Sequence, residues 1–187
     1  MPLPEGGLPW YLHRDDGLMS DINSQIENPE CADAAFMQAA LEQAALSLSE
    51  GNMPIGSVVV HNGEILSFGR NAIDVPADDT RHAELVAIQQ IAPFLARHKR
   101  QCTIYTTLEP CMMCLGAIIN VGIERLVIAA PDGAVGALGL LPHGEYYRYK
   151  RGRMDLVTGV LQTESQALLN EYVRRTGLRS HLASHAG

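Results

Sequence analysis

The spacing of hydrophobic and polar positions changes several times along the chain, and each change predicts a secondary-structure element. From residue 32 to about residue 49, "ADAAFMQAALEQAALSLS" is rich in Ala, Leu and Gln, and its apolar positions recur at helical intervals. The following "EGN" predicts the end of this helix. "IGSVVVH" and "EILSFGR" then flank Asn62 and Gly63, a strong signal for a two-residue hairpin turn. We therefore expect a helix followed by two antiparallel strands.

Helical and strand patterns alternate through the rest of the chain. "HAELVAIQQIAPFL" at 82–95 has helical spacing, and Pro93 predicts fraying or a kink near its end. "CTIYTTL" at 102–108 is β-branched and predicts a strand that runs into a pair of cysteines. The other predicted elements are a short helix in "CLGAIINVG", strands in "RLVIAA" and "MDLVTGVL", and a closing helix in "ESQALLNEYVRR". This alternation favours an α/β protein with a three-layer α/β/α sandwich.

The length of 187 residues suits one domain with tails. Residues 1–30 hold four of the ten prolines and little periodic hydrophobicity, so we expect an irregular N-terminal arm there. The domain is predicted to occupy residues 31–177, and residues 178–187 form a C-terminal tail. The first twenty residues lack the pattern of a signal peptide, and no apolar run approaches the roughly 20 residues of a membrane span. We therefore expect a cytoplasmic protein.

Two cysteines, Cys111 and Cys114, form a C-x-x-C pair where a predicted strand meets a predicted helix. Such a pair can be a redox centre, half of a structural zinc site, or two of the three ligands of a catalytic zinc site. A four-cysteine zinc site would need a second pair, and Cys31 and Cys102 are not suitably spaced, so we expect both to be free thiols. The strand-to-helix context is also typical of redox motifs, so the cysteines alone do not decide.

The upstream segment "HAE" at 82–84 favours catalytic zinc. The imidazole of His82 would complete a His/Cys/Cys set and leave the fourth position of zinc open to water, as in catalytic sites. H-x-E followed by P-C-x-x-C is the signature of zinc nucleobase deaminases, in which the glutamate moves protons and does not bind the metal. The alternatives are a structural histidine and an exposed helix carboxylate, and the joint motif disfavours both.

From about residue 32 to residue 175, the chain resembles the cytidine and deoxycytidylate deaminase superfamily. The resemblance lies in "MPIGSVVVHNGEI", "GRN", "HAELVAI", "YTTLEPCMMCLGAI" and "GAVGALG". These segments look most like tRNA adenosine deaminases, and they are also similar to guanine and cytosine deaminases. The resemblance implies a central mixed sheet of about five strands and a homodimer formed through helices near the cysteine motif. It also implies one Zn²⁺ per chain, held by His82, Cys111 and Cys114.

The resemblance further implies the roles of individual residues. Glu84 would be the catalytic acid and base, taking a proton from water, delivering it to a ring nitrogen and later protonating the departing ammonia. Asn71 would hydrogen-bond the base or its sugar, although asparagine is also a common turn residue after a strand. Ala83, Pro110 and Asp132 complete the expected substrate-binding set.

Charge bears on the choice of substrate. The chain has 21 acidic and 14 basic residues, and its formal charge of −7 opposes non-specific attraction to nucleic acid. "APDGAVG" also lacks the basic residues that tRNA enzymes commonly carry at that position. The basic and aromatic "EYYRYKRGR" at 145–153 could stack on bases and bind phosphates, or it could be an exposed loop or a lid over a small pocket.

The motifs and the charge together leave three functions. We expect a zinc-dependent hydrolytic deaminase of a nucleobase, nucleoside or related amino-heterocycle. The alternative is a tRNA-specific adenosine deaminase. A non-catalytic zinc-binding module is a remote third, which Glu84 disfavours because a structural site needs no general base.

Overall fold

The computed structural model describes residues 29–73, 77–140, 145, 149 and 154–177. Its centre is a five-stranded sheet with the strand order β2-β1-β3-β4-β5. The strands are β1 (Gly56–His61), β2 (Glu64–Arg70), β3 (Cys102–Leu108), β4 (Arg125–Ala130) and β5 (Asp155–Thr158). β1 pairs antiparallel with β2 and β3, whereas the β3–β4 and β4–β5 pairs are parallel. The predicted mixed sheet is therefore confirmed.

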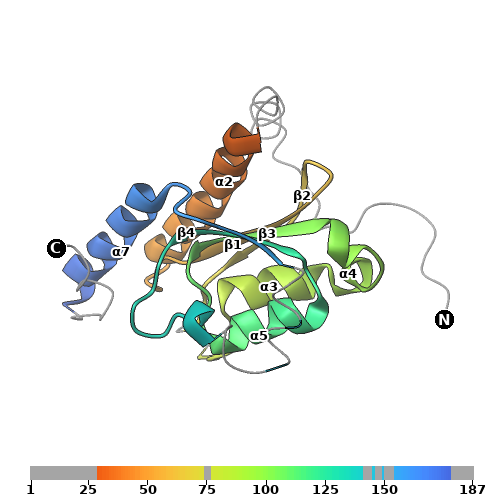
Figure 1. Ribbon diagram of the computed structural model, residues 1–187. Helices are drawn as coiled ribbons and strands as arrows, with labels where there is room; N and C mark the ends of the chain where they lie inside the picture. Colours follow the sequence, from red (N-terminus) through yellow and green to blue (C-terminus); the bar gives the residue numbers. More distant parts are fainter. Residues whose placement is uncertain (1–28, 74–76, 141–144, 146–148, 150–153, 178–187) are drawn as a thin grey trace, which may run out of the picture.

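Helices cover both faces of the sheet (Figure 1). One face carries α2 (Pro29–Ser49) and α7 (Gln162–Thr176), and the other carries α3 (Ala83–Gln90), α4 (Ala92–His98) and α5 (Met112–Val121). Two short 3₁₀ turns, Lys99–Gln101 and Leu138–Leu140, lie in the connections. This is the expected three-layer α/β/α sandwich. Within the described ranges, no helix is both long and apolar enough to cross a membrane.

The hairpin between β1 and β2 turns at Asn62 and Gly63. Both residues have a positive φ, 51° and 80°, as a two-residue type I′ turn requires. His61 and Glu64 pair directly across this turn. The local sequence therefore sets the register of the first two strands.

Several element boundaries differ from the prediction, and three of the differences have a clear cause or consequence. The helix expected over 82–95 is two helices, α3 and α4, because the backbone of Ile91 leaves the helical region (φ −120°, ψ 21°). Pro93 lies in the first turn of α4, where its missing N–H removes no helical hydrogen bond. The first helix begins at Pro29 rather than residue 32. β5 ends at Thr158 because the left-handed residues Gly159 and Leu161 follow it.

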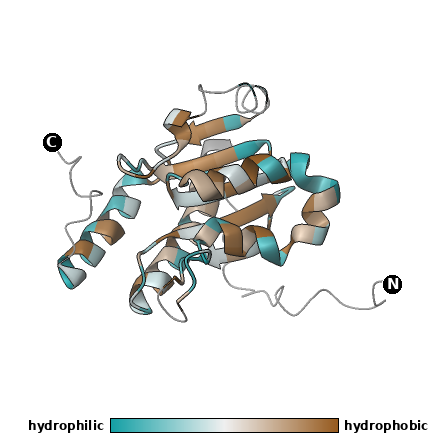
Figure 2. Ribbon diagram, turned by 90° about the horizontal axis from the view of Figure 1, so that it is seen from below, coloured by the Kyte–Doolittle hydropathy of each residue, from teal (hydrophilic) through white to brown (hydrophobic). Residues whose placement is uncertain are grey.

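Alternate residues along the strands point into two separate cores. Val59 and Ile104 pack with the helices α3, α4 and α5, whereas Val58 and Tyr105 pack under α2. In the view of Figure 2, the strands at the centre of the molecule are largely hydrophobic. Thr106 follows Ile104 by two residues, so its side chain belongs to the α3 and α5 face.

A partly buried polar network joins α2 to the sheet. The guanidinium of Arg125 donates to both carboxylate oxygens of Asp33, at 2.8 and 2.7 Å, and to Asp155 at 2.8 Å. The hydroxyl of Tyr105 donates to Asp33 at 2.8 Å. Burial opposes ionisation of Asp33, but the hydrogen bonds from Arg125 and Tyr105 outweigh it and lower the pKa of this carboxyl. The network fixes α2 across β3, β4 and β5.

Candidate metal and active site

His82 lies at the junction between β2 and α3. It is the N-cap residue of α3 and has an extended backbone (φ −73°, ψ 149°). The loop before it is tied to the residues after β2, because Ala72 N donates to Arg81 O at 3.0 Å. α3 packs closely on β2, and a side chain at Gly69 would collide with the backbone carbonyl of Ala83. These contacts fix the end of the helix that carries the imidazole.

Cys111 and Cys114 lie at the beginning of α5. Cys111 is the N-cap residue, with an extended backbone (φ −67°, ψ 171°), and its carbonyl accepts from Leu115 N at 2.9 Å. Cys114 follows three residues later, so the two side chains lie on the same side of the first helical turn. Cys111 also forms an isolated antiparallel bridge with Gly136. The expectation that both cysteines lie at a helix N-terminus is confirmed.

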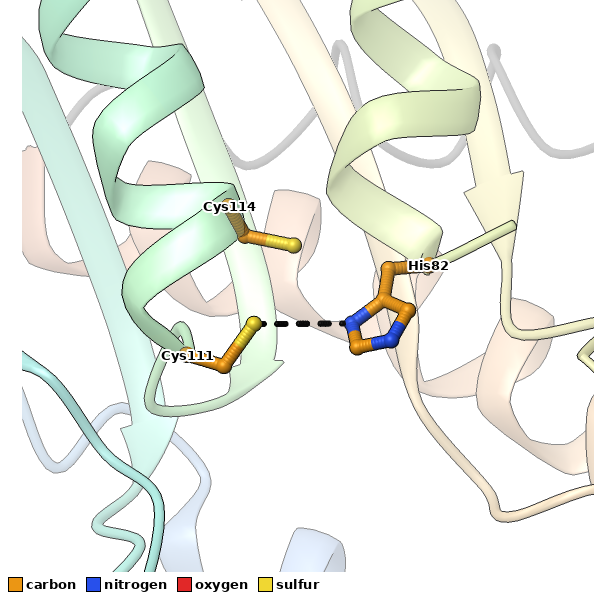
Figure 3. Close-up of side chains that lie close together, drawn as sticks. All are labelled: His82, Cys111 and Cys114. Atoms are coloured by element: carbon orange, nitrogen blue, oxygen red, sulfur yellow. Dashed lines mark hydrogen bonds between the residues drawn. The ribbon is translucent and has the colours of Figure 1, made fainter. Parts of the chain in front are cut away.

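The two helix ends face each other and bring the three side chains together (Figure 3). Cys111 Sγ lies 3.6 Å from His82 Nδ1, and the ligand atoms of His82, Cys111 and Cys114 all lie within 4.8 Å of one another. Tetrahedral zinc would separate a sulfur and a nitrogen ligand by about 3.6 Å. Two thiols and one imidazole are also donors that zinc prefers. Among the described residues, this is the only cluster of three such groups.

The electrostatics of the cluster suit a cation. The hydrogen bonds that Cys111 makes with Cys114 and with His82 lower the pKa of Cys111 to about 3. The same hydrogen bond to Cys111, together with burial, raises the pKa of Cys114. The contact with Cys111 raises the pKa of His82. The thiol of Cys111 is therefore the more readily ionised of the two, which suits a ligand to a cation.

Glu84 lies beside the cluster, on the first turn of α3. It is only 3% exposed, and burial raises the pKa of its carboxyl. Glu84 is not a member of the three-residue cluster, and the expectation that it does not bind the metal stays a prediction. Its catalytic role stays a prediction.

Three of the expected substrate-binding residues lie in segments next to the cluster in sequence: Asn71 follows β2, Ala83 begins α3 and Pro110 precedes α5. Asn71 is buried, its N–H donates to Ile55 O at 2.9 Å and its carbonyl accepts from Ser47 Oγ at 2.8 Å. Within the described part of the chain, no hydrogen bond involves its side-chain amide. Ala83 and Pro110, next to His82 and Cys111 in the sequence, are buried. The contacts of these three residues with a substrate stay predictions.

Asp132 has a clear local role. Its carboxylate accepts hydrogen bonds from Ala134 N at 2.9 Å and Val135 N at 3.2 Å, which holds the turn after β4. The residue is 6% exposed. Its expected contact with substrate also stays a prediction.

Two residues that the sequence motifs do not single out support the site. The carboxylate of Glu109 accepts from Leu138 N at 2.9 Å and from Asp132 N at 3.2 Å, and so holds the loop 131–138 beside the cysteine motif. The hydroxyl of Thr106 reaches the carboxylate of Glu84 at 3.4 Å. Glu109 directly precedes Pro110 and the cysteine pair, and this position in the sequence could have indicated a role at the site. For Thr106, the only indication was its place on the strand, which puts its side chain on the same face of the sheet as Ile104.

Other sequence predictions have a mixed outcome. Cys102 is a free, buried thiol, as expected, and burial raises its pKa to about 11. The side chain of Cys31 lies outside the described residues. Most of "EYYRYKRGR" also lies outside them, and its two described residues, Glu145 and Tyr149, are exposed. Its role therefore stays open between a nucleic-acid contact and a lid.

Comparisons with known proteins agree with this geometry. Residues 31–130 match the model of the cytidine and deoxycytidylate deaminase zinc-binding region. The tRNA-specific adenosine deaminase of Bacillus subtilis is 32% identical over 143 residues, which cover 76% of this chain and 89% of that protein.

Two solved structures are similar over most of the fold. One comes from work on A-to-I editing by tRNA:A34 deaminases at the wobble position of transfer RNA. It has a TM-score of 0.61 and 30% identity, and the match covers 72% of this chain and 98% of that one. The other is NE0047 in complex with 2,6-diaminopurine, with a TM-score of 0.65 and 25% identity, covering 92% of this chain and 93% of that one.

The family match includes His82, Cys111 and Cys114, the residues that the fold brings together. Sequence, fold and donor set therefore agree on a zinc-binding protein. We conclude that the chain belongs to the cytidine and deoxycytidylate deaminase family of zinc-binding hydrolytic deaminases.

Proposed function

We propose that this protein is a tRNA-specific adenosine deaminase, which converts an adenosine within tRNA to inosine and releases ammonia. The observation that carries the proposal is the similarity to the Bacillus subtilis enzyme, which extends over 89% of that protein. Other bacterial tRNA-specific adenosine deaminases are 30–38% identical to this chain. This similarity outweighs the charge argument, because −7 describes the whole chain and a tRNA would contact only one face of it.

A second candidate is a deaminase of a free purine base. It is supported by the similarity to NE0047, which was solved with 2,6-diaminopurine and aligns with 92% of this chain. The structure from work on tRNA:A34 deaminases aligns with 72% of it. Both candidates use the same reaction, in which an amino group on a ring carbon is replaced by a carbonyl oxygen.

His82, Cys111 and Cys114 are the zinc ligands in this proposal, and no fourth protein ligand joins them among the described residues. When bound, zinc supplies the Lewis acidity that makes water a nucleophile near neutral pH. Glu84 accepts the first proton of this water as the oxygen attacks the amino-bearing carbon, and it delivers that proton to the neighbouring ring nitrogen. The second proton passes to the amino group, which leaves as ammonia while the carbonyl forms.

The burial of Glu84 supports this role. The carboxylate is 3% exposed and lies beside Cys114 and Thr106, so bulk water cannot easily exchange with the proton that it carries. Asn71 offers an amide for the base or its sugar, and Ala83, Pro110 and Asp132 complete the proposed substrate-binding set.

The choice between the two substrates is testable with the zinc-loaded protein. We expect it to deaminate an anticodon stem-loop with adenosine at the wobble position. We expect kcat/KM for free adenosine to be lower by about a hundredfold or more, because remote contacts with the RNA help to orient the reacting base. The measurement is inosine formation and ammonia release, with guanine and 2,6-diaminopurine tested in parallel. Turnover of the free bases without turnover of the stem-loop would select the second candidate.

The proposed protein is a homodimer with α5 at its interface. Met112 and Met113, on the first turn of α5, are 63% and 39% exposed, and Val135 in the neighbouring loop is 56% exposed. Exposed apolar side chains gathered next to the cysteine motif support a contact with a second chain here. The dimer would place a neighbouring chain beside the mouth of the site.

Met112→Glu is expected to convert the dimer to a monomer, because a charge would be buried in the contact. Sedimentation velocity at micromolar concentration measures the change. Leu46→Glu is the matched control, because Leu46 is a 46% exposed apolar residue on α2, on the opposite face of the sheet. A wild-type protein that sediments as a monomer would contradict the proposal.

A further inference from the structure

Thr106 occupies a central position next to the proposed catalytic carboxylate. It lies on β3, is completely buried, and faces the α3 and α5 side of the sheet. Its Oγ1 lies 3.4 Å from Glu84 Oε1 and 3.2 Å from the carbonyl oxygen of Leu108. A buried hydroxyl with two acceptors can hold its hydrogen in either of two directions.

Few other groups can donate a hydrogen bond to the carboxylate of Glu84. Among the described residues, its carboxylate interacts with its own backbone N–H, with Cys114 and with Thr106. A cysteine that binds zinc does so as a thiolate, which has no hydrogen to donate. With Cys114 bound to zinc, Thr106 is therefore the remaining side-chain donor to Glu84 in the described part of the chain.

We propose that Thr106 is a positioning residue, whose hydroxyl holds the carboxylate of Glu84 in the orientation that proton transfer requires. The inference rests on the proposed catalytic role of Glu84. The hydroxyl of Thr106 can donate to the carboxylate of Glu84, and its second contact, with the carbonyl oxygen of Leu108, keeps it beside that carboxylate on β3.

The first test compares two substitutions. Thr106→Val keeps the shape of the side chain and removes the hydroxyl, and we expect kcat to fall about tenfold, with KM and zinc content unchanged. Thr106→Ser restores the hydroxyl and should recover most of kcat. If Thr106→Val leaves kcat unchanged, or lowers it together with the zinc content, the inference is wrong.

Thr107→Val is the matched control. Thr107 is also completely buried, but its hydroxyl accepts a hydrogen bond from Gly56 N at 3.0 Å and does not contact Glu84. We expect this variant to lose stability, because Gly56 N is left without its partner, while kcat of the folded protein stays within about twofold of wild type. If kcat of Thr107→Val falls as much as that of Thr106→Val, the loss is a general effect of disturbing β3 and the inference is wrong.

The second test does not depend on activity. Denaturant unfolding of the zinc-loaded wild type, Thr106→Val, Glu84→Ala and the double variant forms a double-mutant cycle. If the two side chains are bonded, Thr106→Val lowers the unfolding midpoint less when Glu84 is already absent. If the shifts of the two single variants add up to the shift of the double variant, the two side chains do not interact and the inference is wrong. If the wild type deaminates no tested substrate, the proposed function fails, and this cycle still decides whether Thr106 and Glu84 are coupled.

Discussion

Glu84→Gln is expected to abolish measurable deamination while the protein keeps its zinc. Glutamine has nearly the volume of glutamate, but it cannot accept a proton from water and return it to the substrate. Removing a general acid and base costs a factor of about 10² to 10⁴ in rate. We predict that proton transfer and metal binding are separate roles, because Glu84 lies next to the His82, Cys111 and Cys114 cluster and is not a member of it.

The experiment measures kcat on the stem-loop and the zinc content of the same preparation. Glu64→Gln is the control, because Glu64 is an exposed carboxylate at the hairpin, and its loss should change neither quantity. Loss of zinc in proportion to activity would contradict the assignment, since it would show that Glu84 holds the metal.

The strands and the hairpin could be predicted from sequence because their signals are local. "CTIYTTL" and "RLVIAA" match β3 and β4 residue for residue, and Asn62–Gly63 supplies the positive φ values of the turn. A kink near Pro93 was predicted, but the division into two helices at Ile91 was not, because the helical spacing of apolar residues continues through it. Ile91 is buried and lies in the same core as residues of both helices, so the pattern looks continuous although the backbone bends.

The candidate site was only partly predictable, because its motifs are local in the sequence but the contact between them depends on the fold. H-x-E and C-x-x-C are local motifs, and they identify the residue types that zinc chemistry needs. Their meeting depends on the fold, in which α3 and α5 lie side by side on one face of the sheet. Thr106 and Glu109 were missed because their partners are more than 20 residues away in the sequence, and the alignment of strands decides which side chains meet.

The substrate was the weakest prediction, because net charge is a sum that carries no positions. Several charges in this chain are paired with each other, as Arg174 and Arg175 are with Glu171, and Arg70 is with Glu50. Such pairs leave the total of −7 unchanged and do not show which face would meet a polyanion. The similarity to tRNA-specific adenosine deaminases is more informative, because the match covers 76% of this chain and 89% of the Bacillus subtilis enzyme.

Cys114→Ser is expected to remove both zinc and activity. Serine has a similar shape, so the first turn of α5 should still form, but its hydroxyl does not ionise near neutral pH and is a poor zinc ligand. Cys114 is completely buried, and Cys102, the remaining free cysteine among the described residues, lies outside the metal cluster. We expect zinc to fall from one ion per chain to a small fraction of that, and turnover to fall below detection.

Cys102→Ser distinguishes this loss from the effect of any buried cysteine substitution. Cys102 is as buried as Cys114, but its thiol donates to the carbonyl of His98 at 3.4 Å and lies outside the metal cluster. A serine hydroxyl can make the same hydrogen bond, so this variant should retain its zinc and its kcat. Elemental analysis and stem-loop deamination of the two variants measure the difference directly. If Cys114→Ser keeps one zinc per chain, or if both variants lose it equally, the three-ligand site is wrong, because its geometry requires Cys114 and has no use for Cys102.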